Sequence, residues 1–158
     1  MTTPLELTEA GILPAEMFDV DLDAVEALFG QFQTTSHRRV LFRKLAEYVD
    51  ALRAADIGEE LIVDGSFVMG CIDEPDDIDV VLVLSETWDL AAGLKPFQYN
   101  LVSKRDVKRN YPIEVFPVIR GSDAETQWTA YFHQINTKWY EPFGFAAGSR
   151  KGLLRIEL

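Results

Sequence analysis

Apolar residues in the first third of the chain recur every three or four positions, which is the spacing of amphipathic helices. The pattern predicts one helix from Asp23, since Asp23 and Glu26 have the spacing of a capping box, and a longer helix that starts after Ser36 and ends at Gly58. Residues 1–20 show no period, and residues 31–35 are predicted to turn. The apolar positions that define the two helices are Leu22, Val25, Leu28, Phe29 and Phe32, then Leu41, Leu45, Tyr48, Val49 and Leu52.

After residue 60 the pattern changes to short apolar runs, which are typical of strands. Residues 61–63 and 77–84 are predicted as strands, and the run VVLVL in the second is typical of a buried central strand. Residues 111–119 form a third predicted strand, and Pro112 and Pro117 either place it near an edge or limit its length, because proline cannot donate to a strand ladder. A last strand is predicted over residues 152–158.

Three more helices are predicted between these strands, over residues 85–92, 96–109 and 123–135, with Asp123 as the cap of the last. The order of elements predicts an α/β (α+β) fold, a mixed sheet flanked by helices. We expect a single domain over residues 1–158. It would have a mainly helical part in residues 1–58, a core in residues 59–120, and a helix and a strand in residues 121–158.

The composition indicates a globular protein, with 47% apolar and 26% charged residues. No apolar run approaches the roughly 20 residues of a membrane span, and the N-terminal residues lack the features of a signal peptide. The single cysteine, Cys71, excludes an internal disulfide framework. We therefore expect a cytoplasmic protein without a membrane partner.

The net charge of −11 argues against broad binding of nucleic acid, but the charge is unevenly distributed. Residues 1–94 carry 20 acids and 5 bases, a net of −15, whereas residues 95–158 carry 6 acids and 10 bases, a net of +4. One interpretation is a solvated acidic surface. The other is a basic wall that faces an acidic site, as a phosphate-bearing substrate requires.

The candidate chemistry centres on two aspartates, Asp77 and Asp79, at the head of the apolar strand. Side chains two positions apart on a strand point to the same face, roughly 6–7 Å apart. Two carboxylates placed in this way repel each other unless a positive charge lies between them. Mg²⁺ takes one or two carboxylates together with phosphate oxygens, so Asp77 and Asp79 are candidate ligands of Mg²⁺ or Mn²⁺.

Three further residues extend this candidate site. Glu114 is an acid within an otherwise apolar strand, and it joins the cluster if its strand neighbours the one that carries the aspartates; otherwise it is an exposed edge residue. Such a set can hold two metal ions. Gly65 and Ser66 follow a strand, where a glycine lets the backbone approach a phosphate and the serine hydroxyl can bond to it.

The densest basic run holds Lys104, Arg105, Lys108 and Arg109. Lys104 and Lys108 share a helix face and are candidates for contact with a triphosphate or an RNA backbone; the alternative is a solvated helix face. Lys151 is a weaker candidate for the same role. No EF-hand, phosphate-binding glycine loop of the P-loop type or zinc-ligand pattern occurs in the chain.

The residues Gly65-Ser66, Asp77-x-Asp79 and a later acid on a strand resemble the signature of the nucleotidyltransferase superfamily. The resemblance implies a palm like that of DNA polymerase beta. It also implies metal-dependent transfer of a nucleoside monophosphate from a nucleoside triphosphate, with release of pyrophosphate. Within the superfamily the chain is most similar to an uncharacterised bacterial family of unknown function. The segments that carry this similarity are Ile12-Leu13-Pro14, the region from Phe29 to Arg39 with its His37-Arg38-Arg39, Asp64-Gly65-Ser66-Phe67-Val68, Asp77-Ile78-Asp79 and Lys151-Gly152-Leu153-Leu154-Arg155-Ile156.

The chain departs from the superfamily pattern at two points. The third acid is often aspartate, whereas here it is Glu114. Polymerising members also carry a helical domain for acceptor and base, and the segment after residue 119 is too short for one. We expect an RNA, protein or small-molecule acceptor. Small relatives occur in toxin–antitoxin or phage-defence loci. The alternatives are a nucleotide-sensing or partner-binding module without turnover, and metal-dependent phosphate hydrolysis. The oligomeric state stays open, since the strand near Pro112 and the terminal strand can each pair between chains.

Overall fold

Five strands form one mixed sheet in the order β1-β5-β2-β3-β4. The computed structural model describes residues 5–30, 36–89 and 91–158, so Phe32 and the turn predicted at residues 31–35 lie outside the described residues. β1 pairs parallel with β5 and β3 pairs parallel with β4, while β2 is antiparallel to both of its neighbours. The strands are β1 (Met17–Asp19), β2 (Glu60–Asp64), β3 (Ile78–Leu84), β4 (Ile113–Ile119) and β5 (Leu153–Glu157).

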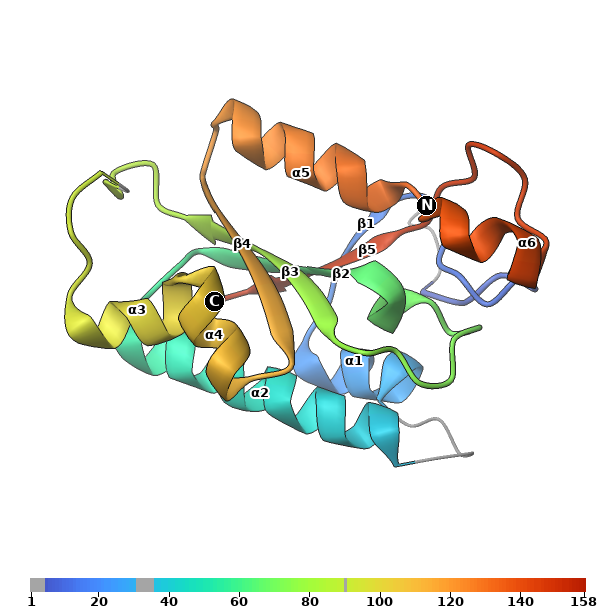
Figure 1. Ribbon diagram of the computed structural model, residues 1–158, viewed down its shortest axis with the longest axis horizontal. Coiled ribbons are helices and arrows are strands. Elements are labelled where there is room, and N and C mark those ends of the chain that lie inside the picture. Colours follow the sequence, from blue (N-terminus) through green and yellow to red (C-terminus); the bar gives the residue numbers. More distant parts are fainter. Residues whose placement is uncertain (1–4, 31–35, 90) are drawn as a thin grey trace.

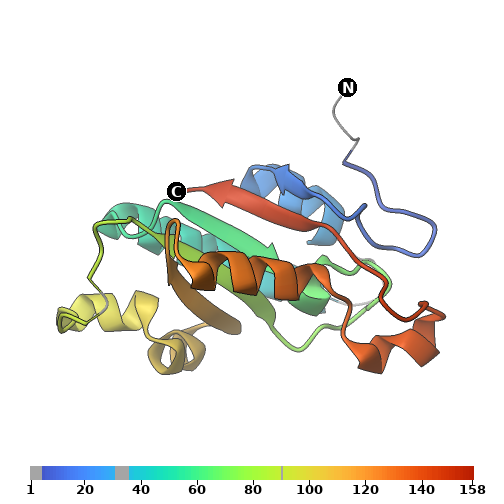
Figure 2. The same cartoon turned by 90° about the horizontal axis from the view of Figure 1, so that it is seen from above.

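Helices cover both faces of the sheet (Figures 1 and 2). α1 and α2 lie on one face, where α3 and α4 extend their layer, and α5 lies on the other face. The helices are α1 (Leu22–Phe29), α2 (His37–Ala55), α3 (Pro96–Val102), α4 (Lys104–Asn110), α5 (Asp123–His133) and α6 (Tyr140–Phe143), with the 3₁₀ turns η1 (Gly65–Val68) and η2 (Thr137–Trp139). This architecture confirms the predicted mixed α/β class. Within the described ranges, no helix combines the length and apolar character that crossing a bilayer requires.

The alternation of side chains along the strands divides the core into two layers. In β3, Val80 and Leu82 pack under α1 and α2, whereas Val81 and Val83 pack under α5. Because Asp79 has the same parity as Val81, it belongs to the α5 face of the sheet. β3 lies between β2 and β4, as its apolar run predicted. β4 is an edge strand, which is one of the two outcomes that Pro112 and Pro117 indicated; Pro117 lies within the strand and Pro112 just before it.

The terminal strand differs from one expectation, because it is not free to pair with a second chain. β5 lies between β1 and β2, and both of its edges are occupied within the chain. The short strand β1 was not predicted, since three residues cannot show a period.

The helix boundaries correct several predictions. Asp21, not Asp23, caps α1, because its extended backbone lets the side chain accept from Ala24 N at 2.8 Å. Asp56 adopts the left-handed conformation and ends α2 before Gly58. Likewise Ser122, not Asp123, caps α5 by accepting from Glu125 N at 3.2 Å.

The structure differs from two of the predicted helices. The described part of residues 85–92 contains turns and no helix, and the Ser85 hydroxyl accepts from Thr87 N at 3.2 Å in place of a helix cap. The helix predicted over residues 96–109 is broken at Ser103, whose extended backbone separates α3 from α4. η2 and α6 were not predicted, because their short turns lack an apolar period.

A buried arginine joins α2 to the segment that follows β2. The Arg38 side chain is fully buried and donates five hydrogen bonds of 2.6–3.1 Å to backbone carbonyls. Burial lowers its pKa to about 10, so the guanidinium stays charged at neutral pH. The acceptors are the carbonyl oxygens of Phe29, Phe67, Met69 and Ile72. The guanidinium therefore fixes the loop between η1 and β3.

We expect Arg38→Met to lower the free energy of unfolding by about 3–5 kcal/mol, because removal of the guanidinium leaves buried carbonyls without a donor. Arg39→Met is the matched control, since the neighbouring Arg39 is exposed and surface changes cost about 0.5 kcal/mol or less. Urea unfolding of both variants measures the difference. Equal stability of the two variants would contradict this role of Arg38.

Candidate functional site

Three acids, Asp77, Asp79 and Glu114, lie together at one end of the sheet and are called the acid row below; a fourth, Asp64, stands next to them. The strand register places Asp64 of β2 opposite Asp79 of β3, and Asp79 opposite Glu114 of β4. Asp77 precedes Asp79 by two residues and faces the same side. One carboxylate oxygen each from Asp77, Asp79 and Glu114 lie within 4.8 Å of one another. The structure thus brings together the three acids that the sequence singled out.

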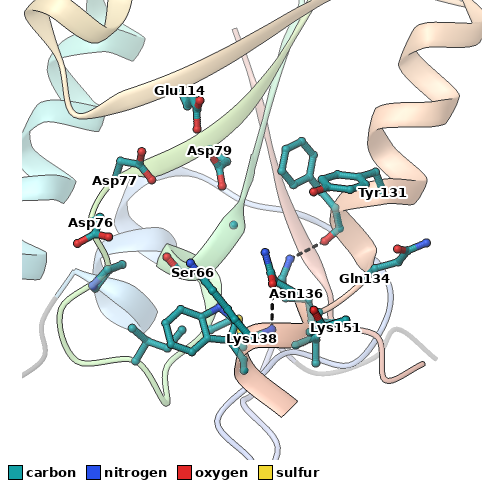
Figure 3. A pocket seen from close by; sticks show the side chains of 18 of the residues that line it. Ser66, Asp76, Asp77, Asp79, Glu114, Tyr131, Gln134, Asn136, Lys138 and Lys151 are labelled. Carbon is teal, nitrogen blue, oxygen red and sulfur yellow. Dashed lines mark hydrogen bonds between the residues drawn. The ribbon is translucent and has the colours of Figure 1, made fainter. Parts of the chain in front are cut away.

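The acid row lines a pocket at the N-terminal ends of β3 and β4 (Figure 3). The cavity has a volume of about 560 Å³, which lies within the range of small-molecule sites. Figure 3 shows Asp77, Asp79 and Glu114 on one side, and Asn136 and Lys151 across from them. The polar residues that line the cavity include Ser66, Asp76, Asp77, Asp79, Glu114, Gln134, Asn136, Lys138 and Lys151.

The electrostatics of the row are unfavourable. Burial, followed by the negative charges of Asp77 and Glu114, raises the pKa of Asp79 to about 7, and the Lys151 charge opposes this shift. Burial and then the charge of Glu114 also raise the pKa of Asp77, against the effect of Lys108. A cation bound among these oxygens would relieve both the desolvation and the repulsion. The oxygen donors suit a hard divalent ion such as Mg²⁺ or Mn²⁺.

Gly65 is required by its contact with Asp79. Its φ of +77° lies in the left-handed region, and a Cβ added there would collide with the Asp79 carboxylate. The backbone of η1 therefore packs directly against this carboxylate. Ser66 follows on η1 and lines the cavity, so both residues of the predicted Gly-Ser pair lie at the acid row.

Lys104 and Lys108 reach the acids from α4. Lys104 Nζ lies 3.4 Å from Glu114 Oε1 and 4.2 Å from the centre of the Phe116 ring, and Lys108 Nζ lies 3.9 Å from Asp77 Oδ2. Both lysines are exposed, and ion pairs of this kind contribute about 0–1 kcal/mol. Neither lysine lines the cavity, where the described lysines are Lys138 and Lys151.

The structure places two buried ionisable residues, Asp64 and Lys151, next to the site. Asp64 is fully buried, and neither of its carboxylate oxygens has a hydrogen-bond partner among the described residues. Burial raises its pKa well above the usual value, and the charge of Lys151 opposes this shift. Lys151 is also buried; its ammonium donates to Phe132 O at 2.5 Å, and burial lowers its pKa to about 8.

From the sequence, Asp64 was named only within a segment that resembles the uncharacterised family; Lys151 was named in another such segment and as a weaker candidate for phosphate contact. The signal for Asp64 was an acid directly after the apolar residues Leu61–Val63. Only the register between β2 and β3 shows that this acid stands beside Asp79.

Comparison with known proteins gives one match. The model of a family of unknown function, DUF6932, matches residues 5–157, in accord with the uncharacterised family that the sequence resembles. Searches of curated proteins and of solved structures gave no significant match.

We expect the metal-free protein to lose stability as the pH rises from about 4 to 7. The raised pKa of Asp79 means that the folded state binds more protons than the unfolded state in this window, so folding is favoured at the lower pH. Asp79→Asn should flatten this dependence and raise the free energy of unfolding at pH 7.5 by about 1–3 kcal/mol. Urea unfolding between pH 4 and 8 tests this expectation, with Asp50→Asn on the exposed side of α2 as control. A slope in Asp79→Asn as steep as that of the wild type would disprove it.

We expect Gly65→Ala to damage the site more than a glycine substitution of equal backbone cost. Gly148 also has a positive φ, of +81°, but an added Cβ there meets nothing within 4 Å. Gly148→Ala should therefore cost only the backbone strain, about 1–2 kcal/mol. Gly65→Ala should cost more, because the added Cβ also displaces the Asp79 carboxylate. Thermal unfolding of both variants makes the comparison, and equal effects would contradict the packing of Gly65 against Asp79.

Proposed function

We propose that this chain, which belongs to DUF6932, a family of unknown function, is a metal-dependent nucleotidyltransferase. It would move a nucleoside monophosphate from a nucleoside triphosphate to an RNA, protein or small-molecule acceptor. The observation that carries the proposal is the meeting of Asp77, Asp79 and Glu114 within 4.8 Å beside Gly65 and Ser66. These residues come from three segments of the chain, at positions 65–66, 77–79 and 114, and they converge on one cavity.

The chemistry of the donors supports Mg²⁺ or Mn²⁺ as the cofactor. Asp77 and Asp79 would bind the metal ions and Glu114 would complete the ligand set, since all three offer carboxylate oxygens on one face of the sheet. When bound to these carboxylates, divalent ions would supply Lewis-acid activation of an attacking hydroxyl and charge stabilisation of the leaving pyrophosphate. The repulsion from Asp77 and Glu114 that contributes to the raised pKa of Asp79 supports the same assignment, because a bound cation would relieve it.

The residues of the chain would position the substrate. Gly65 brings the backbone of η1 against Asp79, and the Ser66 hydroxyl lies at the cavity where phosphate oxygens would meet it. Lys104 and Lys108 balance the charges of Glu114 and Asp77 from outside the cavity. That either of them also steadies the phosphates remains a prediction.

The alternative is a nucleotide-sensing or partner-binding module that uses the same fold without turnover. Glu114 in place of the usual aspartate, and the pairing of Glu114 with Lys104, are the observations that favour it. Such a module would bind a nucleoside triphosphate with Mg²⁺ and would transfer nothing. Phosphate hydrolysis at the same carboxylates differs again, because it would release inorganic phosphate in place of pyrophosphate.

We expect Asp77→Asn and Asp79→Asn each to reduce transfer by about 10³-fold, the equivalent of roughly 4 kcal/mol in the activation barrier. The measurement is incorporation of label from each labelled nucleoside triphosphate into cellular RNA and protein, with Mg²⁺ or with EDTA. Asp50→Asn serves as control, and circular dichroism confirms that each variant is folded. Undiminished transfer in either site variant would rule out this assignment. Binding without label incorporation by the wild type would favour the module.

A further inference from the structure

The wall of the cavity opposite the acids is formed by the end of α5, by η2 and by the residues just before β5. Backbone hydrogen bonds join these segments: Lys151 N donates to His133 O at 2.8 Å and Ile135 N donates to Ser149 O at 3.3 Å. The His133 ring adds a hydrogen bond between its Nδ1 and Lys151 O at 2.9 Å. The wall is therefore held in place by the fold, which lowers the cost of ordering it around a ligand.

The ammonium of Lys151 lacks the partner that a buried cation normally has. In the described part of the chain it makes one hydrogen bond, to the carbonyl oxygen of Phe132, and no carboxylate lies within 4.0 Å of it. An ammonium has three N–H donors, so two remain for other acceptors. A buried charge is costly unless it is paired and fully hydrogen-bonded. Since Lys151 lines the cavity, an anionic ligand there would supply the missing acceptors.

Two neighbouring groups add donors on the same wall. Asn136 Oδ1 accepts from Lys138 N at 3.0 Å, which turns the amide NH₂ away from η2 and into the cavity, beside Lys151 (Figure 3). The Lys138 ammonium lies 4.8 Å from the centre of the Trp139 ring, and its charge acts on Asp77. Figure 3 shows the side chains of all three residues at the cavity below Asp79.

We propose that Asn136, Lys138 and Lys151 form an anion subsite that holds the non-transferred phosphates of a nucleoside triphosphate. The proposal rests on the proposed function and identifies which cations serve it. Lys104 and Lys108 contact Glu114 and Asp77 from outside, whereas Lys138 and Lys151 lie inside the cavity. The acids and the cations thus face each other across the cavity, so a metal-bound polyphosphate would meet carboxylates through its metal and donors through its outer oxygens.

The negative charge of the acid row means that an anionic ligand should bind only together with a cation. A free anion would be repelled by Asp77, Asp79 and Glu114, so binding should require a divalent ion as well as the lysines. Inorganic tripolyphosphate is a suitable probe, because it carries the phosphates without base, ribose or acceptor. Its binding tests the subsite separately from any transfer reaction.

The experiment is titration calorimetry of tripolyphosphate, with and without Mg²⁺, on the wild type and on Lys151→Met and Lys138→Met. We expect Mg²⁺-dependent binding that each substitution weakens about 10–100-fold, as loss of a charge-assisted contact does. Lys44→Met is the matched control, since Lys44 pairs with Glu47 on the surface of α2. Lys138 is exposed, so its variant stays informative if Lys151→Met fails to fold.

The outcomes separate this proposal from the proposed function. Unchanged affinity in Lys138→Met and in folded Lys151→Met overturns the subsite, and so does the absence of Mg²⁺-dependent tripolyphosphate binding by the wild type. Label transfer by the wild type in either case would leave the nucleotidyltransferase proposal standing. Conversely, lysine-dependent tripolyphosphate binding without transfer of label from any nucleoside triphosphate supports the subsite and contradicts the transferase.

Discussion

Repulsion among buried and half-buried carboxylates is the constraint on which this end of the molecule depends. Asp64, Asp79 and Glu114 stand side by side on adjacent strands, and Asp77 joins them from the loop that leads into β3. A sheet built only for stability would place valine or isoleucine here, as it does at the next positions of β3. Stability given up at a cluster of like charges is typical of a site that binds a cation or a reacting group.

Arg38 fixes the segment that leads to the acids, and its charge is used by backbone carbonyls and not by the carboxylates. Its charge is satisfied by carbonyl oxygens of the segment between Gly65-Ser66 and Asp77. His37, its neighbour at the start of α2, lies 2.5 Å from Pro75 O through Nε2. The loop that links the glycine-serine pair to the aspartates is thus fixed by α2 at both ends. The acids can then keep their positions although they repel one another.

Local pattern was sufficient for much of the fold and for part of the site. The alternation Asp77-x-Asp79 before an apolar run specifies both the strand and the shared face, and Pro112 and Pro117 indicate an edge or a short strand, because these effects act within a few residues. Asp64 and Lys151 could not be placed in this way. Their proximity to Asp79 depends on the register of β2 with β3 and on the bonds between residues 149–151 and the end of α5, which no local period encodes. The helix predicted at residues 85–92 failed for a related reason, since Ser85 can cap a turn as well as a helix.

The uneven distribution of charge along the chain corresponds to two groups of opposite charge that meet at the cavity. Three of the four clustered acids come from residues 1–94, and all four lysines around them, Lys104, Lys108, Lys138 and Lys151, come from residues 95–158. The lysines divide into two sets that sequence spacing alone could not separate. Lys104 and Lys108 are bound to acids at the outer side of the row, and they limit its repulsion before any ligand arrives. Lys138 and Lys151 line the cavity on the wall across from the row, and among the described residues neither of them forms an ion pair with an acid. A site that separates its cations from its acids in this way keeps both charges available, and a metal with its phosphates is the kind of ligand that satisfies both at once.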